Sequence, residues 1–362
     1  MCILEKAEKE ISHIRIITCI MKLEKIFKEA IERKASDVYI TTNSKPVLRI
    51  AGDLVILDGY PLFTNEMAHE YLLEIMTDLQ AGEFKQKNDI DFSVELSKVA
   101  RLRVNVFMQR NGIGGVFRLI PSQIPTMEEL GLPEVFKKIP ALPNGLVLVT
   151  GPTGSGKSTT LAALLNDINI HTDAHIITIE DPIEFVYENN KSVVDQREVH
   201  THTESFQSAL RAALREDPDV ILVGEMRDME TISLAITAAE TGHLVFATLH
   251  TSGAAQTIDR IVNVFPGERQ NQIRSELAES LRAVIWQKLF KRKEGGRVAG
   301  YEILFINNAA ASLIRENKIH QILSVIETGA KEGMQTMQKS VMALLANDLI
   351  EKEEADEHLP KK

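Results

Sequence analysis

The sequence predicts an α/β protein in which a larger domain with a parallel sheet follows a smaller α+β domain. Downstream of residue 145, short continuous apolar runs alternate with helical segments, which is the pattern of strand–helix–strand units. Before residue 120, short strand-like pieces with one polar face indicate an antiparallel sheet. The chain has 362 residues, which is long enough for two separate cores.

The smaller domain is predicted to begin with a helix over Leu23–Arg33, because apolar residues recur there at helical spacing. Strand-like pieces follow at Val38–Ile40, Pro46–Ile50 and Arg101–Phe107. In the last piece polar and apolar residues alternate, so one face of the sheet is expected to carry charge. We assign this domain to residues 21–120. Residues 1–20 form an extension before it, either an added helix or the product of a misplaced start codon.

A proline-rich stretch separates the two domains. Residues 121–144 contain Pro121, Pro125, Pro133, Pro140 and Pro143, a spacing that suits a linker better than a regular element. The larger domain is predicted to cover residues 145–350. A charged tail follows over residues 351–362 and is expected to be solvated.

Four apolar runs predict the parallel sheet of the larger domain. They are Leu146–Thr150, His175–Ile179, Val220–Val223 and Leu244–Leu249. Such runs are typical of strands that helices cover on both faces. Polar or glycine residues follow each run, and in open α/β sheets ligands bind beyond the carboxyl ends of the strands. The functional residues are therefore expected at these ends.

Composition and charge exclude several classes of protein. The net charge of −10 argues against nucleic-acid binding, which usually requires a basic surface. No apolar stretch approaches the roughly 18 to 20 residues that a transmembrane helix needs. The chain has two cysteines, too few for a disulfide framework. We interpret the protein as cytoplasmic.

The strongest local signal is a P-loop between the first of these strands and an amphipathic helix. Its glycines allow backbone N–H groups to surround phosphates, and the helix N-terminus adds a favourable dipole. Lys157 is expected to reach the β- and γ-phosphates of ATP, and Ser158 to hold Mg²⁺. The alternative is a glycine-rich turn without function. The residues expected to contact nucleotide are Gly151, Pro152, Thr153, Gly154, Ser155, Gly156, Lys157, Ser158 and Thr159.

Two acidic strand ends are candidates for the catalytic carboxylates. Glu225 follows Val220–Val223 and is expected to hold Mg²⁺, through water. Glu184 lies beyond the strand His175–Ile179 and is a candidate to accept a proton from the attacking water. Glu180 and Asp181, near it, are about as well explained as structural acids. A surface-loop acid remains the alternative for Glu225.

Histidines flank the last predicted strand. His250 follows it and could contact the γ-phosphate, although a structural histidine explains the sequence equally well. His243 precedes the strand, just after the glycine expected to cap a helix over Thr231–Glu240. His200 and His202 could suggest a metal, but no acid or cysteine lies nearby at ligand spacing.

Arginines could stabilise charge on the transferred phosphoryl group. Arg103 and Arg118 lie on the predicted polar face of the smaller domain. To act at the P-loop they would have to arrive across a domain or subunit interface. The alternative is that they are surface charges on a half-solvated sheet.

Several segments of this sequence resemble the motifs of secretion ATPases. GPTGSGKST, ITIEDPIEF, REVHTHTESFQSALRAALREDPDVILVGEMRD and TGHLVFATLHT look like the Walker A motif, Asp box, Walker B motif and His box of that superfamily. The resemblance is greatest to the PilT family, the type IV pilus retraction ATPases, and extends from Met21 to about Ile350. It includes RLRVNVF, GGVFRLIPS and LIRENKIHQI.

The resemblance implies a PAS-like N-terminal domain and a RecA-like ATPase domain, assembled as a hexamer that binds ATP and Mg²⁺. It implies that Glu184 is the general base and Glu225 the Walker B acid. It also implies that His243 and His250 respond to the nucleotide. Arg103 and Arg118 would approach the phosphates. The implied partner is the inner-membrane platform protein of the pilus, so the chain would associate peripherally with that membrane.

Two departures and two alternatives accompany this resemblance. An alanine, Ala311, stands where the family has an arginine in a segment linked to retraction. The extension of residues 1–20 is the second departure. A related pilus or secretion ATPase, or an accessory retraction paralogue, is one alternative; longer relatives of that kind carry a paired CxxC zinc module, which is absent here. The other is a nucleotide-binding scaffold that does not hydrolyse ATP.

Overall fold

The computed structural model describes residues 23–50, 52–96, 100–120 and 123–358. The predicted extension of residues 1–20 lies outside them. The chain divides into two compact units, Met1–Ser122 and Gln123–Lys362, and each is described by itself. The predicted α/β class is confirmed.

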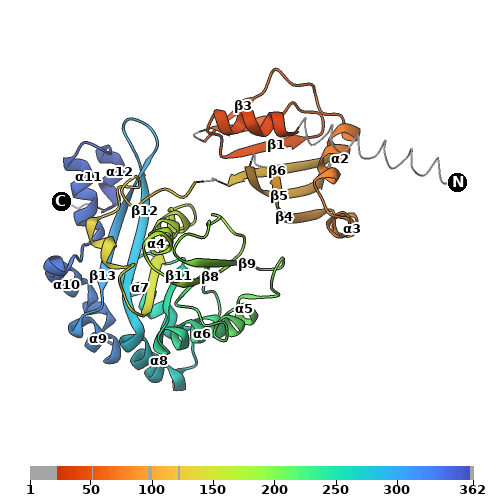
Figure 1. The fold of residues 1–362 in the computed structure, drawn as a ribbon. Helices are drawn as coiled ribbons and strands as arrows, with labels where there is room; N and C mark the ends of the chain where they lie inside the picture. The colour runs from red at the N-terminus through yellow and green to blue at the C-terminus, as the bar shows by residue number, and fades with distance from the viewer. Residues whose placement is uncertain (1–22, 51, 97–99, 121–122, 359–362) are drawn as a thin grey trace. The chain divides into compact units, whose positions relative to one another are not determined.

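The first unit has a six-stranded antiparallel sheet with helices on one face (Figure 1). Residues 23–32 are helical, and Phe27 meets Phe117 of the sheet edge-to-face. The sheet order is β3-β2-β1-β6-β5-β4. The elements are β1 Asp37–Thr41, β2 Val47–Ile50, β3 Asp53–Ile56, α2 Asn65–Glu74, α3 Asp78–Lys87, β4 Asp89–Leu96, β5 Ala100–Gln109 and β6 Gly112–Ile120.

Helices of the first unit begin where the sequence supplies caps. Thr64 and Thr77 each accept a hydrogen bond from the first turn of α2 and α3. The second of these is a capping box completed by Gln80. The helix predicted over Leu23–Arg33 and the strands predicted at Val38–Ile40, Pro46–Ile50 and Arg101–Phe107 are confirmed within a few residues.

The second unit contains a seven-stranded sheet of order β13-β12-β7-β11-β10-β8-β9. All neighbours are parallel except β12 and β13. The strands are β7 Gly145–Thr150, β8 His175–Glu180, β9 Val193–Glu198, β10 Val220–Val223, β11 Leu244–Leu249, β12 Leu281–Lys291 and β13 Arg297–Phe305. The four strands predicted in this domain are therefore confirmed.

Helices cover both faces of this sheet (Figure 1). Leu146 and Leu148 of β7 pack in the core on one side, and Val147 and Val149 in the core on the other, which explains the continuous apolar run. The helices are α4 Lys157–His171, α5 Phe206–Ala213, α6 Met229–Glu240, α7 Ala254–Asn263, α8 Gly267–Ser280, α9 Asn308–Arg315, α10 Ile322–Thr328, α11 Met337–Ala346 and α12 Lys352–Ala355; short 3-10 turns are η1 Glu134–Lys138, η2 Ile319–Gln321, η3 Gly329–Glu332 and η4 Asp356–His358.

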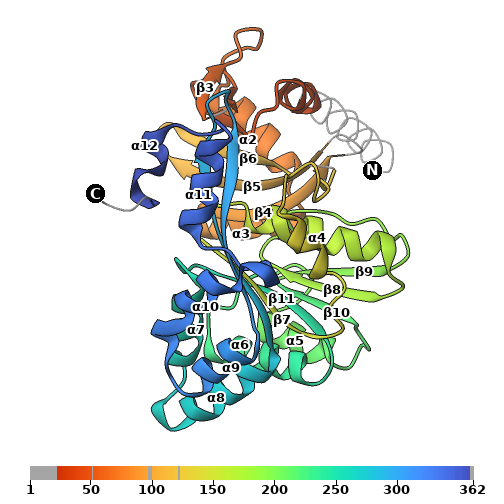
Figure 2. The ribbon, with the colours of Figure 1, turned by 90° about the vertical axis from the view of Figure 1, so that its left-hand side faces the viewer.

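Two predicted boundaries need correction. The segment predicted to be a linker instead belongs to the second unit from residue 123, because Met127, Phe136 and Ile139 are buried in its core. The predicted tail is mostly exposed, but its α12 packs through the buried Ala355 beside Phe290, in a cluster next to β12 and α11 (Figure 2). Both boundaries differ from the prediction because apolar side chains are interspersed among the prolines of the first segment and among the charges of the second. None of the described helices is long and apolar enough to cross a membrane.

Candidate active site

The P-loop joins β7 to the N-terminus of α4. Gly151, Gly154 and Gly156 have φ of +146°, +76° and +87°, which side-chain-bearing residues rarely adopt. A Cβ on Gly151 would lie 2.3 Å from the backbone oxygen of Gln287, so the loop also passes too close to β12 for a side chain. No side chain caps α4. Its first N–H groups are therefore available to an anion.

Ser155 supports the interpretation of this loop as a phosphate cradle. Its Oγ is buried and, within the described part of the chain, has no hydrogen-bond partner. A buried hydroxyl without a partner costs free energy, and native structures rarely leave one. A phosphate oxygen in the loop would accept its hydrogen bond. The residues present therefore fit a nucleotide phosphate.

Lys157 carries the positive charge of the site. It is 8% exposed, and its Nζ donates to the carbonyl oxygens of Gly151 at 2.9 Å and Pro152 at 3.1 Å. Burial lowers the pKa of Lys157, while Glu225 and Glu184 act on it in the opposite direction. Glu225 and Glu184 are therefore near enough for their charges to act on the Lys157 ammonium group. Ser158 and Thr159 follow in the first turn of α4, whereas Pro152 and Thr153 are exposed in the loop.

Glu225 follows β10 and lies between the side chains of Arg227 and His250. Arg227 Nη2 donates to Glu225 Oε2 at 2.7 Å, and His250 Nε2 lies 3.4 Å from Oε1. Burial by itself raises the pKa of Glu225, but Arg227 and His250 outweigh it and the net pKa is lowered. Glu225 is therefore anionic at neutral pH, as a magnesium-binding acid must be.

Glu184 lies in the loop that follows β8, the strand next to β10. Its side chain is exposed, as is that of Asp181. Glu180, at the end of β8, is buried instead: it accepts hydrogen bonds from Thr178 Oγ1 at 2.6 Å and Gln196 Nε2 at 3.2 Å. Burial raises the pKa of Glu180 to about 7, against these hydrogen bonds. Of the acids near β8, Glu184 is the exposed one whose charge acts on Lys157.

The two predicted histidines lie at opposite ends of β11. His250 follows the carboxyl end, beside Glu225. His243 precedes the strand, and its Nδ1 lies 2.9 Å from the carbonyl oxygen of Ala238 in α6. A six-residue strand is about 20 Å long, so His243 is not at the P-loop of its own chain. In this chain His243 completes the end of α6, and its expected response to the nucleotide stays a prediction.

Arg103 and Arg118 belong to the first unit, where they are direct neighbours on β5 and β6. Arg118 also faces Asp37, with Nε 3.0 Å from Oδ1. Arg49 lies opposite Asp37 on the next strand. Arg49, Arg118 and Arg103 thus lie in one cross-strand row with a single carboxylate, that of Asp37. Like charges directly opposite each other destabilise a sheet.

Sequence reasoning missed two residues of the site. Gln287 is 2% exposed in β12; its Nε2 donates to the carbonyl oxygen of Ser155 at 2.8 Å and its Oε1 accepts from Thr160 Oγ1 at 2.8 Å. Arg227 is the partner of Glu225. The available signal for Gln287 was an amide within the apolar run LRAVIWQKLF.

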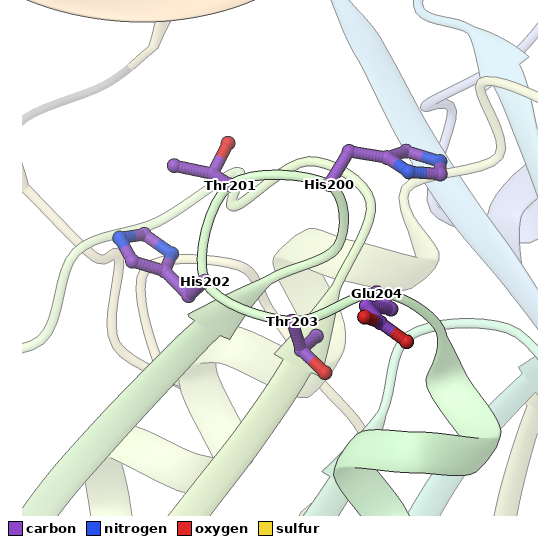
Figure 3. Close-up of a pocket in the computed structure, with 5 residues that line it drawn as sticks. All are labelled: His200, Thr201, His202, Thr203 and Glu204. Atoms are coloured by element: carbon purple, nitrogen blue, oxygen red, sulfur yellow. The ribbon is translucent and has the colours of Figure 1, made fainter.

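His200 and His202 lie in the loop between β9 and α5, beside a surface hollow lined by residues 200–204 (Figure 3). Figure 3 shows the two rings pointing away from each other. His202 Nδ1 accepts the backbone N–H of Glu198 at 3.0 Å, so that ring holds the turn. Among the described residues no group of three His, Cys, Asp or Glu side chains could hold a metal ion.

Known proteins are similar to this chain over most of its length. A family model described as "Type II/IV secretion system protein" matches residues 15–355. The type IV pilus "retractation" ATPase PilT of Pseudomonas aeruginosa is 52% identical over 337 residues, which are 93% of this chain and 98% of PilT. A twitching motility protein of Neisseria gonorrhoeae is 56% identical over 86% of this chain and 83% of its own. The crystal structure of the pilus retraction motor PilT with bound ADP superimposes with a TM-score of 0.88, at 46% identity over 93% of this chain and 97% of the other.

Proposed function

Because this chain belongs to the family of type II/IV secretion system proteins, we propose that it hydrolyses ATP to power the retraction of type IV pili. The observation that carries this proposal is the convergence of Lys157, Glu184 and Glu225 at a P-loop. The length-wide similarity to a pilus retraction ATPase favours pili as the system that it serves.

The P-loop residues bind and orient the triphosphate. Backbone N–H groups within residues 153–158 and the hydroxyl of Ser155 donate to phosphate oxygens. Lys157 exchanges its two P-loop carbonyl contacts for the β- and γ-phosphates when ATP is bound. Because the ammonium is already buried at this place, little rearrangement is needed.

Glu184 and Glu225 have different roles in the reaction. Glu184, exposed and close enough to act on Lys157, accepts the proton of the attacking water. Glu225, kept anionic by Arg227 and His250, and the hydroxyl of Ser158 would hold Mg²⁺. When bound, Mg²⁺ neutralises charge on the β- and γ-phosphates. His250 is placed to change its contact with Glu225 when the γ-phosphate leaves.

Arg103 and Arg118, which belong to the first unit of a chain, supply positive charge to the nucleotide site. The row that holds them has a surplus of positive charge, which an anion such as the γ-phosphate would compensate. The chain acts as a homohexamer in the cytoplasm, so that these arginines reach a nucleotide across a domain or subunit interface. The ring acts on the inner-membrane platform protein of the pilus. Ala311 is buried in α9, in the segment where the family's arginine is linked to retraction.

Pilus length and surface motility in a strain that lacks this protein test the proposal. Retraction predicts abundant long pili and no twitching, restored by the unchanged chain but not by Lys157→Ala. Loss of pili would instead assign the chain to pilus assembly. Normal pili and normal twitching would place it in another secretion system or in an accessory role.

A further inference from the structure

The side chain of Glu184 is exposed, so its carboxylate is placed mainly by the backbone that carries it. That backbone is the loop from Asp181 to Tyr187, which has no regular secondary structure. General-base catalysis requires the carboxylate to lie within hydrogen-bond reach of the attacking water. Whatever fixes this loop therefore contributes to the reaction.

Gln196 of β9 holds the loop on the carboxyl side of Glu184. Its Nε2 donates to the carbonyl oxygen of Phe185 at 2.8 Å, and its Oε1 accepts the backbone N–H of Tyr187 at 3.0 Å. The side-chain amide of Gln196 thus pairs with the loop backbone at Phe185 and Tyr187, much as the backbone of a neighbouring strand would. The same Nε2 lies 3.2 Å from Glu180 Oε1.

Glu180 connects this amide to the backbone of Glu184 itself. Its buried carboxylate accepts hydrogen bonds from Thr178 and Gln196, and the nearby backbone N–H of Glu184 lowers its pKa. Gln196 therefore bonds both the carbonyl of Phe185 and the carboxylate that lies near the backbone of Glu184.

Glu198, two residues along the same face of β9, holds the amino side of the loop. It is 5% exposed, and its Oε2 accepts the backbone N–H of Ile183 at 3.1 Å. Its Oε1 accepts a hydrogen bond from Thr201 Oγ1 at 3.1 Å, in the turn drawn in Figure 3. Gln196 and Glu198 therefore hold the loop on both sides of Glu184.

From this geometry we propose that Gln196 and Glu198 are positioning residues that set the place of the Glu184 carboxylate. The edge strand β9 then serves the reaction without touching nucleotide. This inference rests on the proposed role of Glu184 as the base. Its structural part, that β9 fixes the loop, stands independently of that role.

The test is Gln196→Leu in the full chain, which removes all three contacts at similar side-chain volume. We expect kcat for ATP to fall about 10- to 100-fold, since displacement of a reacting group by about 1 Å has that effect. KM for ATP should stay within about twofold, because the P-loop is untouched. Gln196→Asn, which keeps the amide but shortens its reach, serves if the leucine variant does not fold. Gln335→Leu is the matched control: it removes a side-chain hydrogen bond to the carbonyl of Tyr301, away from the loop, and should leave kcat unchanged.

A double-mutant cycle with Glu184→Ala separates positioning from general damage. In that background Gln196→Leu should lower kcat no further, because it acts through the missing carboxylate. Equal losses of kcat with and without Glu184, or a kcat equal to that of the unchanged chain, would overturn the proposal.

Hydrogen exchange of the Tyr187 amide gives a readout that does not depend on catalysis. Gln196→Leu should accelerate this exchange at least about tenfold, corresponding to the loss of one hydrogen bond that protects it. Unchanged exchange would overturn the inference even if kcat falls. If Glu184→Ala hydrolyses ATP as fast as the unchanged chain, the proposed base is wrong, while the exchange result still decides whether β9 holds the loop.

Discussion

Replacing Gln287 by leucine tests how far β12 determines the shape of the P-loop. The Gln287 amide joins the Ser155 carbonyl to the Thr160 hydroxyl from a position that is 2% exposed. Leucine has a similar volume but cannot make either hydrogen bond. The Ser155 carbonyl then loses the bond that Gln287 gives it.

The expected cost follows from that carbonyl. A buried acceptor that loses its partner costs about 1 to 3 kcal/mol. If this cost falls on the P-loop conformation that binds phosphate, the Kd for ATP rises about 5- to 100-fold, at about 1.4 kcal/mol per factor of ten. If it falls on the whole unit, the free energy of unfolding drops by the same amount.

The assay pairs equilibrium binding of a fluorescent ATP analogue with urea unfolding, at one fixed protein concentration. Gln335→Leu is again the control, since it should lose at most about 1 kcal/mol of stability and no affinity. Unchanged Kd and unchanged unfolding in Gln287→Leu would refute the reasoning, because they would mean that the amide contributes to neither.

Three further outcomes are expected. Gly151→Ala should abolish ATP binding, because its Cβ would lie 2.3 Å from the Gln287 backbone oxygen; Gly154→Ala, where φ is also positive but space is open, should bind ATP more weakly without losing it, by the same binding assay. Burial raises the pKa of Glu180 from 4.5 to about 7, so the folded chain keeps a proton there that the unfolded chain has released. The free energy of unfolding should therefore fall as pH rises from about 4.5 to 7, by up to about 3 kcal/mol relative to Glu180→Gln, and parallel pH profiles of the two proteins would contradict this. His250→Ala should lower kcat about 10-fold or more and change Kd for ATP little, because it contacts Glu225 and not the P-loop; a changed Kd with normal kcat would contradict that role.

The sequence was most informative where local pattern and chemistry coincide. The strand ends that carry Gly151, Glu225 and His250 follow from apolar runs and from the rule that ligands bind at carboxyl ends. The glycines of the P-loop have the positive φ that their spacing implies. These strands and the P-loop glycines were therefore predictable from short segments alone.

Contacts between distant segments could not be predicted. Gln287 reaches the P-loop because β12 pairs with β7, and Gln196 reaches the Glu184 loop because β9 pairs with β8. Strand order decides both contacts, and no local pattern records it. The place of His243 could not be predicted either, since this motif residue lies at the end of β11 opposite to His250. The burial of Ala355 likewise depends on β12 and α11, not on its charged neighbours.

The central claim is that this chain hydrolyses ATP as an assembled ring through the residues at its P-loop. ATP turnover by the purified protein, measured per subunit over a range of concentrations, tests it most directly, with Lys157→Ala and Glu184→Ala measured alongside. We expect a rate per subunit that rises with concentration as the ring assembles, vanishes in Lys157→Ala and falls to a small residual rate in Glu184→Ala. Turnover no higher than that of Lys157→Ala, in protein shown to be assembled, would contradict the claim and assign the chain a scaffolding role.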